Sequence, residues 1–86
     1  MKPTQIKPIS LGEILRCEYM QPRKLTVGEL SKALSVSRTT LSAIINDKRP
    51  LTAKQAVKLA EQLGTTAEFW MRIQIANQLW EARNGF

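Results

Sequence analysis

The sequence predicts an all-α domain of five helices, and three observations lead to that prediction. No stretch of five or more residues alternates apolar and polar side chains with β-branched enrichment, so no strand is expected. Helix-capping motifs recur along the whole chain, and the apolar residues between them are spaced for helices. With 86 residues, 43% of them hydrophobic, the chain suits one small globular domain.

The expected helices begin at hydroxyl residues that can cap them. In a capping box, a Ser or Thr accepts a bond from the backbone three residues later, where a Glu or Gln returns it. Ser37 is a simple N-cap candidate. Four pairs have the capping-box spacing: Ser10–Glu13, Thr26–Glu29, Thr52–Gln55 and Thr65–Glu68. These starts predict helices at residues 11–20, 26–34, 38–46, 53–63 and 67–83.

Helix breakers and apolar stripes agree with those ranges. Pro22 separates the first helix from the second, Pro50 separates the third from the fourth, and Gly64 is a natural helix stop. The stripes of the first four helices are Leu11, Ile14, Leu15 and Tyr19; Val27, Leu30 and Leu34; Leu41, Ile44 and Ile45; and Ala56, Val57, Leu59, Ala60 and Leu63.

We expect one domain at residues 10–86, preceded by a flexible arm at residues 1–9 that holds two prolines and two lysines. The chain has no His and a single Cys, Cys17, which excludes a structural zinc site and a disulfide framework. No apolar run approaches the roughly 18 residues of a membrane helix, and the first ten residues lack the apolar stretch of a signal peptide. A cytoplasmic protein is therefore expected.

The net charge of +6 is concentrated in the middle of the chain. All of the basic excess lies between residues 20 and 60, whereas the two ends nearly balance. A basic block in a folded region is typical of a protein with a polyanion partner, either nucleic acid or an anionic membrane. A solvated face that only aids solubility is the alternative. The basic residues do not line one strongly amphipathic helix, which disfavours a membrane.

Only Ser35, Val36 and Ser37 connect the second expected helix to the third. A connection this short forces the two helices to cross steeply, with Val36 filling the angle between them. This is the geometry of a helix-turn-helix unit, whose second helix enters the major groove of DNA by its N-terminal end. The residues expected to face inward are Leu30, Leu34, Val36, Leu41 and Ile44.

The outward residues of the third helix suit a protein that reads base pairs. Arg38 can make a bidentate contact to guanine, and Asn46 can pair with adenine. Lys48 and Arg49, in the following loop, are placed for backbone phosphates. The alternatives are that Ser37 only caps, that Asn46 is a helix C-cap and that Arg38 is solvated. Hydroxyl groups for phosphates or bases come from Ser37, Thr39, Thr40 and Ser42.

The last expected helix has more apolar surface than a monomer needs. At about 100° per residue, its apolar side chains form two sectors, with Trp70 outside both. One sector is expected to pack on the other helices and the second to join a homodimer through residues 69–86, unless one wide core contact absorbs both. Paired half-sites on an inverted repeat are expected as well, since one module covers only about 600–1,000 Å² on DNA. The core sector is Phe69, Ile73, Ala76 and Trp80, and the dimer sector is Met71, Ile75, Leu79 and Ala82, followed by Phe86.

Three stretches carry a resemblance to a known family: LGEIL from residue 11, LSVSRTTLSAIINDKRPLTA from residue 34 and LAEQLGTTAEFWMRIQ from residue 59. The middle stretch resembles helix-turn-helix proteins of the phage-repressor type. Over residues 10–83 the chain resembles HigA-type antitoxins, and the GTTAEFWMRIQ segment is the most specific part. The resemblance implies a bacterial antitoxin that dimerises, represses its own operon and neutralises a HigB toxin, a RelE-like ribosome-dependent mRNA endonuclease.

The sequence departs from that family pattern at three positions. Ser35 stands where the turn commonly has Gly, which implies either that φ is not positive there or that the backbone is strained. Ser31 stands where Ala is common, so its hydroxyl needs a partner if it is buried. Val27 stands where many members have a phosphate-binding Gln, which leaves the backbone amides near Thr26 as the expected phosphate contact.

Other classes of function have less support from the residues. An enzyme is not expected, because there is no His for general-base chemistry or to activate Cys17, and no Gly-rich phosphate loop. No metal or cofactor is expected either. An interaction protein that has lost DNA binding is disfavoured by Arg38, Lys48 and Arg49. A plain phage-type or operon-specific repressor without a toxin partner stays the alternative. For a toxin, we expect the arm and the first helix to form the contact.

Overall fold

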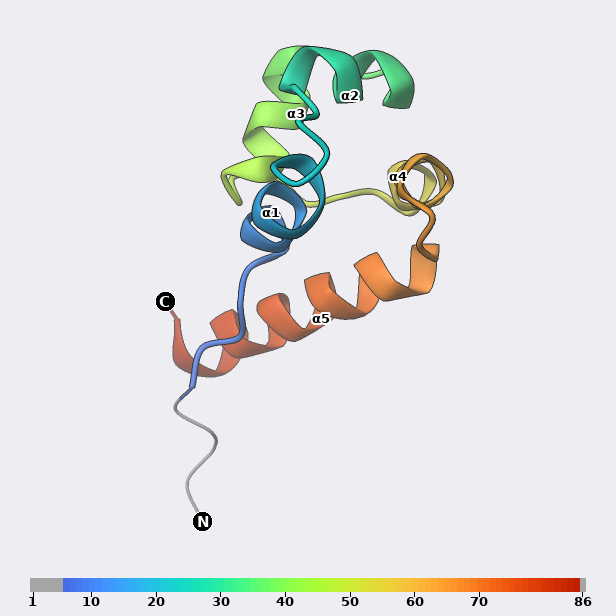
Figure 1. The fold of residues 1–86 in the computed structure, drawn as a ribbon. Coiled ribbons are helices and arrows are strands. Elements are labelled where there is room, and N and C mark those ends of the chain that lie inside the picture. Colours follow the sequence, from blue (N-terminus) through green and yellow to red (C-terminus); the bar gives the residue numbers. More distant parts are fainter. Residues whose placement is uncertain (1–5, 86) are drawn as a thin grey trace.

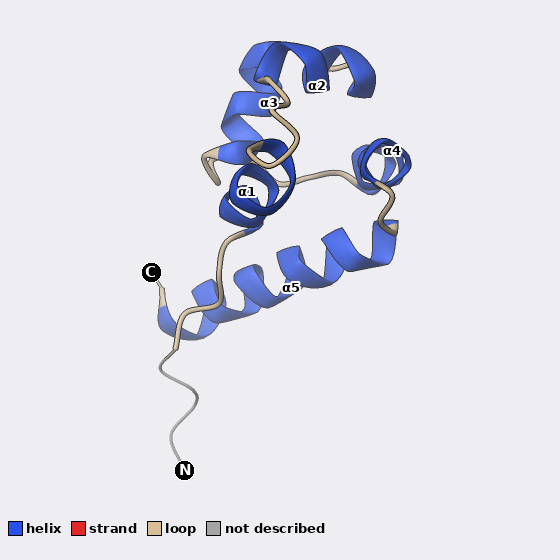
Figure 2. Ribbon diagram, in the orientation of Figure 1, coloured by secondary structure: helices blue, strands red, loops and turns tan. Residues whose placement is uncertain are grey.

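The computed structural model describes residues 6–85, and all regular structure in that range is helical, as predicted (Figure 2). The first helix has two segments, α1 and the π-helical η1, which continue into each other. The elements are α1 (Leu11–Ile14), η1 (Leu15–Met20), α2 (Val27–Leu34), α3 (Arg38–Ile45), α4 (Ala53–Leu63) and α5 (Ala67–Asn84). The predicted ranges for all five helices are therefore confirmed to within a residue or so.

The two ends of the molecule are formed by different helices. In Figure 1, α2 and α3 lie together at one end, α5 crosses the opposite end, and α1 and α4 lie between them. The packing agrees with this view, since α1 contacts both α3 and α5, and α4 contacts both α2 and α5. A ligand held by α3 and a partner held by the outer face of α5 would therefore not compete for space.

The core lies where the five helices meet. It is almost wholly aliphatic, apart from Trp70, whose side chain is 0% exposed. The indole N–H of Trp70 donates to the Thr65 Oγ1 at 2.7 Å, so this buried polar group is satisfied. Tyr19 and Phe69 pack edge-to-face against the same indole, with ring centroids 5.2 and 5.0 Å away. The other large side chains that are fully buried are Leu15, Leu30, Leu34, Leu41, Ile44 and Leu59.

The predicted caps form at four helix starts, and the fifth is displaced by one residue. Thr26 and Thr52 make complete capping boxes, while Ser10 and Ser37 each accept from the backbone N–H three residues later. The prediction of a box at Thr65–Glu68 is wrong. Thr66 caps α5 by accepting from the Phe69 N–H, because the Thr65 hydroxyl is already the acceptor for Trp70.

The sequence predicts one regular helix over residues 11–20, but the second part of this helix is π-helical. After Ile14 it changes to i→i+5 bonding, as in the bond from the Gln21 N–H to the Arg16 carbonyl at 2.9 Å. In an α-helix, residues five apart lie about 140° apart around the axis. The wider π-turns bring Leu15 and Met20 closer to one face, and both are buried in the core.

The inward face of α5 differs from the predicted one. Of the expected core sector, Phe69, Ile73 and Trp80 are half-buried at its edge, and Ala76 is exposed. The centre of the face is Trp70, followed by polar side chains rather than by further apolar ones. On α4, the predicted stripe also needs a correction, because Val57 is 49% exposed.

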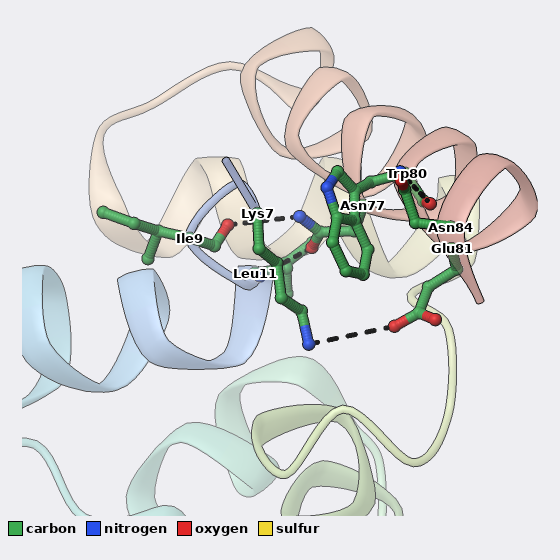
Figure 3. A network of polar contacts seen from close by, with 7 residues as sticks. All are labelled: Lys7, Ile9, Leu11, Asn77, Trp80, Glu81 and Asn84. Atoms are coloured by element: carbon green, nitrogen blue, oxygen red, sulfur yellow. Dashed lines mark hydrogen bonds and ion pairs between the residues drawn. The ribbon is translucent and has the colours of Figure 1, made fainter. Parts of the chain in front are cut away.

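The start of the described chain lies along the C-terminal half of α5 (Figure 3). The Lys7 ammonium lies 3.9 Å from the Glu81 carboxylate and 5.2 Å from the Trp80 ring centroid. The Asn77 amide donates to the Ile9 carbonyl at 3.1 Å. The flexibility expected for residues 1–9 stays a prediction, and residues 1–5 lie outside the described part.

Candidate nucleic-acid interface

The turn between α2 and α3 has the helix-turn-helix form that the sequence predicts. α2 ends at Ser35, whose backbone is left-handed, with φ 56° and ψ 41°. The Val36 N–H donates to the Ser31 carbonyl at 3.0 Å, and the half-buried Val36 side chain packs against the core. Of the two outcomes expected for Ser35, the structure shows positive φ, which costs a residue with a Cβ roughly 1–2 kcal/mol.

Close packing of α2 on α3 also requires a small side chain at position 31. Ser31 is 4% exposed, and its hydroxyl donates to the Gly28 carbonyl at 3.0 Å. The buried hydroxyl therefore has the partner that the sequence analysis requires, within its own helix. Such a bond avoids the about 1–3 kcal/mol that an unsatisfied buried polar group costs.

α3 buries one face and exposes the other as predicted. Leu41, Ile44 and Ile45 are buried, whereas Arg38 and Thr39 at the N-terminal end are exposed. The remaining residues of the outward face are half-buried and sit on its flanks: Thr40, Ser42 and Ala43. The end of α3 that a helix-turn-helix protein inserts into the groove is therefore accessible to solvent.

Three of the predicted DNA-contact residues form one hydrogen-bonded group. The Ser37 Oγ accepts from the Thr40 N–H at 3.0 Å and donates to the Thr40 Oγ1 at 2.9 Å. The Arg49 guanidinium donates to the same Oγ1 at 3.3 Å. Sequence reasoning placed Arg49 in a separate loop, but this bond brings its charge to the first turn of α3.

In the loop after α3, the acidic side chain bonds to the start of α1, whereas the basic side chains are free of such backbone bonds. Asp47, with φ 59°, accepts from the Gly12 N–H at 3.1 Å and so serves the start of α1. Lys48 and Arg49 are exposed. Asn46 occupies the C-cap position, and its side-chain amide donates to the Ser42 carbonyl at 2.9 Å. The second N–H and the carbonyl oxygen of this amide stay available, as the pairing with adenine that the sequence suggests requires.

The donors of Thr26 are used within α2. Both its N–H and its hydroxyl donate to the Glu29 Oε1, at 2.9 and 3.0 Å. These bonds hold the pKa of the Glu29 carboxyl below its ordinary value of 4.5, and the bond from the Thr26 backbone has the larger effect. A phosphate at this helix start would therefore meet the amides of Val27 and Gly28, while Thr26 itself is occupied.

Much of the predicted dimer sector is exposed on α5. Ile75 is 50% exposed, Leu79 is 45% exposed and Ala82 is exposed too. Met71 is half-buried against the core, which makes it the edge of the sector. Phe86 lies outside the described residues.

Sequence reasoning missed the two amides that attach α5 to the rest of the molecule. The Gln74 side chain accepts from the Leu51 N–H at 2.6 Å and donates to the Leu51 carbonyl at 2.8 Å. The Asn77 side chain accepts from the Leu11 N–H at 2.9 Å (Figure 3). One signal existed: at helical spacing both residues fall in the same sector as Trp70.

Other kinds of site lack the necessary residues in the described range. Residues 6–85 contain no group of three or more His, Cys, Asp or Glu side chains that could hold a metal ion. No helix there is long and apolar enough to cross a membrane. Cys17 is a free, half-buried thiol.

Comparisons with known proteins agree with this geometry. The helix-turn-helix family profile matches residues 18–70. Antitoxin HigA-1 of Vibrio cholerae is 44% identical over 100% of this chain and 81% of its own length. The uncharacterized HTH-type transcriptional regulator YbaQ of Escherichia coli K12 is 43% identical over 98% of this chain and 74% of its own.

A solved structure of the Pseudomonas aeruginosa antitoxin HigA with the higBA promoter superimposes with a TM-score of 0.81 at 36% identity. The superposition covers 91% of this chain and 87% of the Pseudomonas aeruginosa chain. The similarity extends over the whole helical domain, including α5, which lies mostly beyond the matched helix-turn-helix region. The chain belongs to the HigA-type antitoxin family of helix-turn-helix proteins.

Proposed function

We propose that this protein is an antitoxin and repressor, not an enzyme, which binds the operator of its own toxin–antitoxin operon as a homodimer and neutralises a HigB-type toxin. It would act in the cytoplasm, on its operator in the nucleoid. The observation that carries the proposal is the charge arrangement around α3. Its N-terminal end exposes Arg38, while the nearest acidic side chains of the unit, Glu29 and Asp47, are held in bonds to backbone N–H groups.

In this proposal α3 lies in the major groove and its first turn reads bases. Arg38 would donate to the O6 and N7 of a guanine, and the methyl groups and hydroxyls of Thr39 and Thr40 would meet adjacent base edges. Asn46 would meet an adenine with its carbonyl oxygen and its second amide N–H. Ser42, on the flank of α3, would donate to a phosphate. Ser37 would do so once its hydroxyl releases the Thr40 Oγ1.

Backbone phosphates would be held on both sides of α3. Lys48 and Arg49 supply positive charge after the helix, and the N–H groups of the first turn of α2, next to Thr26, point to the other side. These contacts carry no sequence information but set the register of α3 on the duplex. They also make the affinity depend strongly on salt.

Two copies would join through the outer face of α5. The exposed Ile75, Leu79 and Ala82 form its centre, with Met71 and Phe86 at the edges. Because α5 lies at the opposite end from α3, this interface would leave the α3 helix of each copy free. For such a dimer we expect paired half-sites about one helical turn apart. We expect Leu79→Glu to yield monomers in sedimentation experiments and to weaken operator binding.

The test of DNA binding is footprinting and fluorescence anisotropy with the duplex upstream of the protein's own gene. A protected palindrome is expected. Arg38→Ala should weaken binding by about 1–3 kcal/mol and relax preference at one base pair per half-site. Arg16→Ala, which removes the same exposed side chain from the first helix, is the control. No protected palindrome, or unchanged affinity after Arg38→Ala, contradicts the proposed mode of reading.

The toxin partner needs a separate experiment, since the similarity to YbaQ favours a plain repressor as the second candidate. Co-expression with the small protein encoded beside the gene separates the two. An antitoxin should restore growth and co-purify with that protein, and substitutions in residues 6–9 and the first helix should weaken the complex. A plain repressor should do neither.

A further inference from the structure

The side chain of Arg38 rests on Gly28, which is the second residue of α2. A Cβ built at Gly28 would lie 2.7 Å from Arg38 Nη2, 3.0 Å from Cζ and 3.1 Å from Nε. All three distances are shorter than the 3.4 Å at which ordinary van der Waals contact begins. The guanidinium therefore occupies the space that any larger side chain at position 28 would take.

We propose that Gly28 is a positioning residue for base recognition, which seats the Arg38 guanidinium against α2 and leaves its donors ready for a guanine. Gly28 does not touch DNA bases in this proposal. It acts through Arg38, so the inference rests on the function proposed above, in which Arg38 reads a base.

The state of the guanidinium supports this role. Within residues 6–85, no hydrogen bond or ion pair engages the Arg38 side chain. Contact with Gly28 restrains the group, while its N–H donors stay unpaired. A bidentate pair with guanine needs both properties, because the planar fork must meet two acceptors at once. A side chain that is already seated also loses less conformational freedom on binding.

The backbone conformation does not require a glycine at position 28. Its φ is not positive, since Gly64 is the only glycine with positive φ in the described range. Alanine is the better helix former, and a glycine inside a helix lowers its stability. The backbone alone would therefore favour Ala at position 28. What excludes a Cβ is the far end of the Arg38 side chain, which can move without disturbing the core.

The experiment compares operator discrimination in wild type, Gly28→Ala, Arg38→Ala and the double variant. Discrimination is the ratio of Kd values for the operator and for a duplex changed at the base pair that Arg38 reads. We expect about 5- to 150-fold in the wild type, the range of one bidentate pair. Gly28→Ala should lower it by at least about threefold toward the level of Arg38→Ala. Its melting temperature should not fall.

The double variant shows whether the effect passes through Arg38. If Gly28 acts by seating the guanidinium, the double variant discriminates no worse than Arg38→Ala alone. Ala33→Gly is the matched control, because it alters helix propensity at an exposed site on the same helix and should leave discrimination intact. In the free protein, NMR should show a nuclear Overhauser contact between the Gly28 Hα and Arg38 Hε protons, and its absence counts against the seat.

Two results overturn the inference while leaving the proposed function in place. One is full discrimination by Gly28→Ala, and the other is an additive loss in the double variant. If the wild type itself shows no preference for its operator, the proposed function fails and takes the inference with it. The two failures are therefore distinguishable.

Discussion

Gly12 is the most closely packed glycine in the described chain, and replacing it should markedly lower the stability of the fold. It lies at the second position of α1, where α1 crosses the end of α3. A Cβ there would lie 1.9 Å from the Ile45 carbonyl oxygen and 2.6 Å from its carbon. Both atoms belong to the backbone, so no side-chain rotation can relieve the clash. Gly12→Ala must push the two helices apart.

The cost can be worked out from what that movement breaks. Overpacking a core site costs about 1–3 kcal/mol, with values at the upper end expected where backbone is displaced. Separation also weakens the bond from the Gly12 N–H to Asp47, which is worth about 1 kcal/mol. Against this, Ala gains about 1 kcal/mol over Gly in a helix. The net loss is about 2–3 kcal/mol, which lowers the melting temperature of a domain this size by about 10–20 °C.

The assay is thermal and urea unfolding at a fixed protein concentration, because dimerisation would make stability depend on concentration. Far-UV circular dichroism follows the helices, and tryptophan fluorescence follows the buried Trp70. Gly28→Ala is the control, since it makes the same change where only a flexible side-chain end is in the way. It should melt at or above the wild type. A Gly12→Ala protein that melts within about 2 °C of the wild type would refute the reasoning.

Three other changes test separate features. Ser35→Gly removes the strain of the left-handed turn and should raise the free energy of unfolding by about 0.5–1 kcal/mol in urea titrations; a loss of stability would contradict the strain. The lowered pKa of Glu29 means that its bonds to Thr26 stabilise the fold above its ordinary pKa of 4.5, and that this contribution disappears as the pH falls further. The wild type should therefore melt above Glu29→Gln at neutral pH, and the gap should close in melts at pH values below 4.5. Lys48→Ala should weaken binding to all DNA sequences alike and reduce the salt slope by about one per subunit, measured by anisotropy over a salt series; a change confined to one base pair would show that Lys48 reads bases instead.

The helix boundaries followed from the sequence because capping is a local interaction. A Ser or Thr and the residues that follow it decide where a helix starts, so Thr26, Ser37 and Thr52 were found correctly. Thr65 was assigned wrongly because its hydroxyl is used by Trp70, and local spacing does not reveal a competing partner.

The face of α5 could not be predicted from hydropathy. Periodicity assumes that inward positions are apolar, but after Trp70 the inward positions are Gln74 and Asn77, whose partners are backbone groups far away in the sequence. The seat of Arg38 on Gly28 was missed for a similar reason. A glycine with ordinary helical φ gives no local signal, and only the packing of α2 on α3 shows what fills its place.

The carboxamide of Gln74 pairs with the N–H and C=O of Leu51 as a neighbouring peptide group would. Paired hydrogen bonds are directional and fix the orientation of a helix, whereas an apolar contact alone lets the helix rotate about its own axis. The angle and rotation of α5 relative to the other helices are thus fixed. In a symmetric dimer joined through α5, that angle sets the distance between the two α3 helices. The tolerance of the protein for altered operator spacing should then depend on two amide side chains that never approach the duplex.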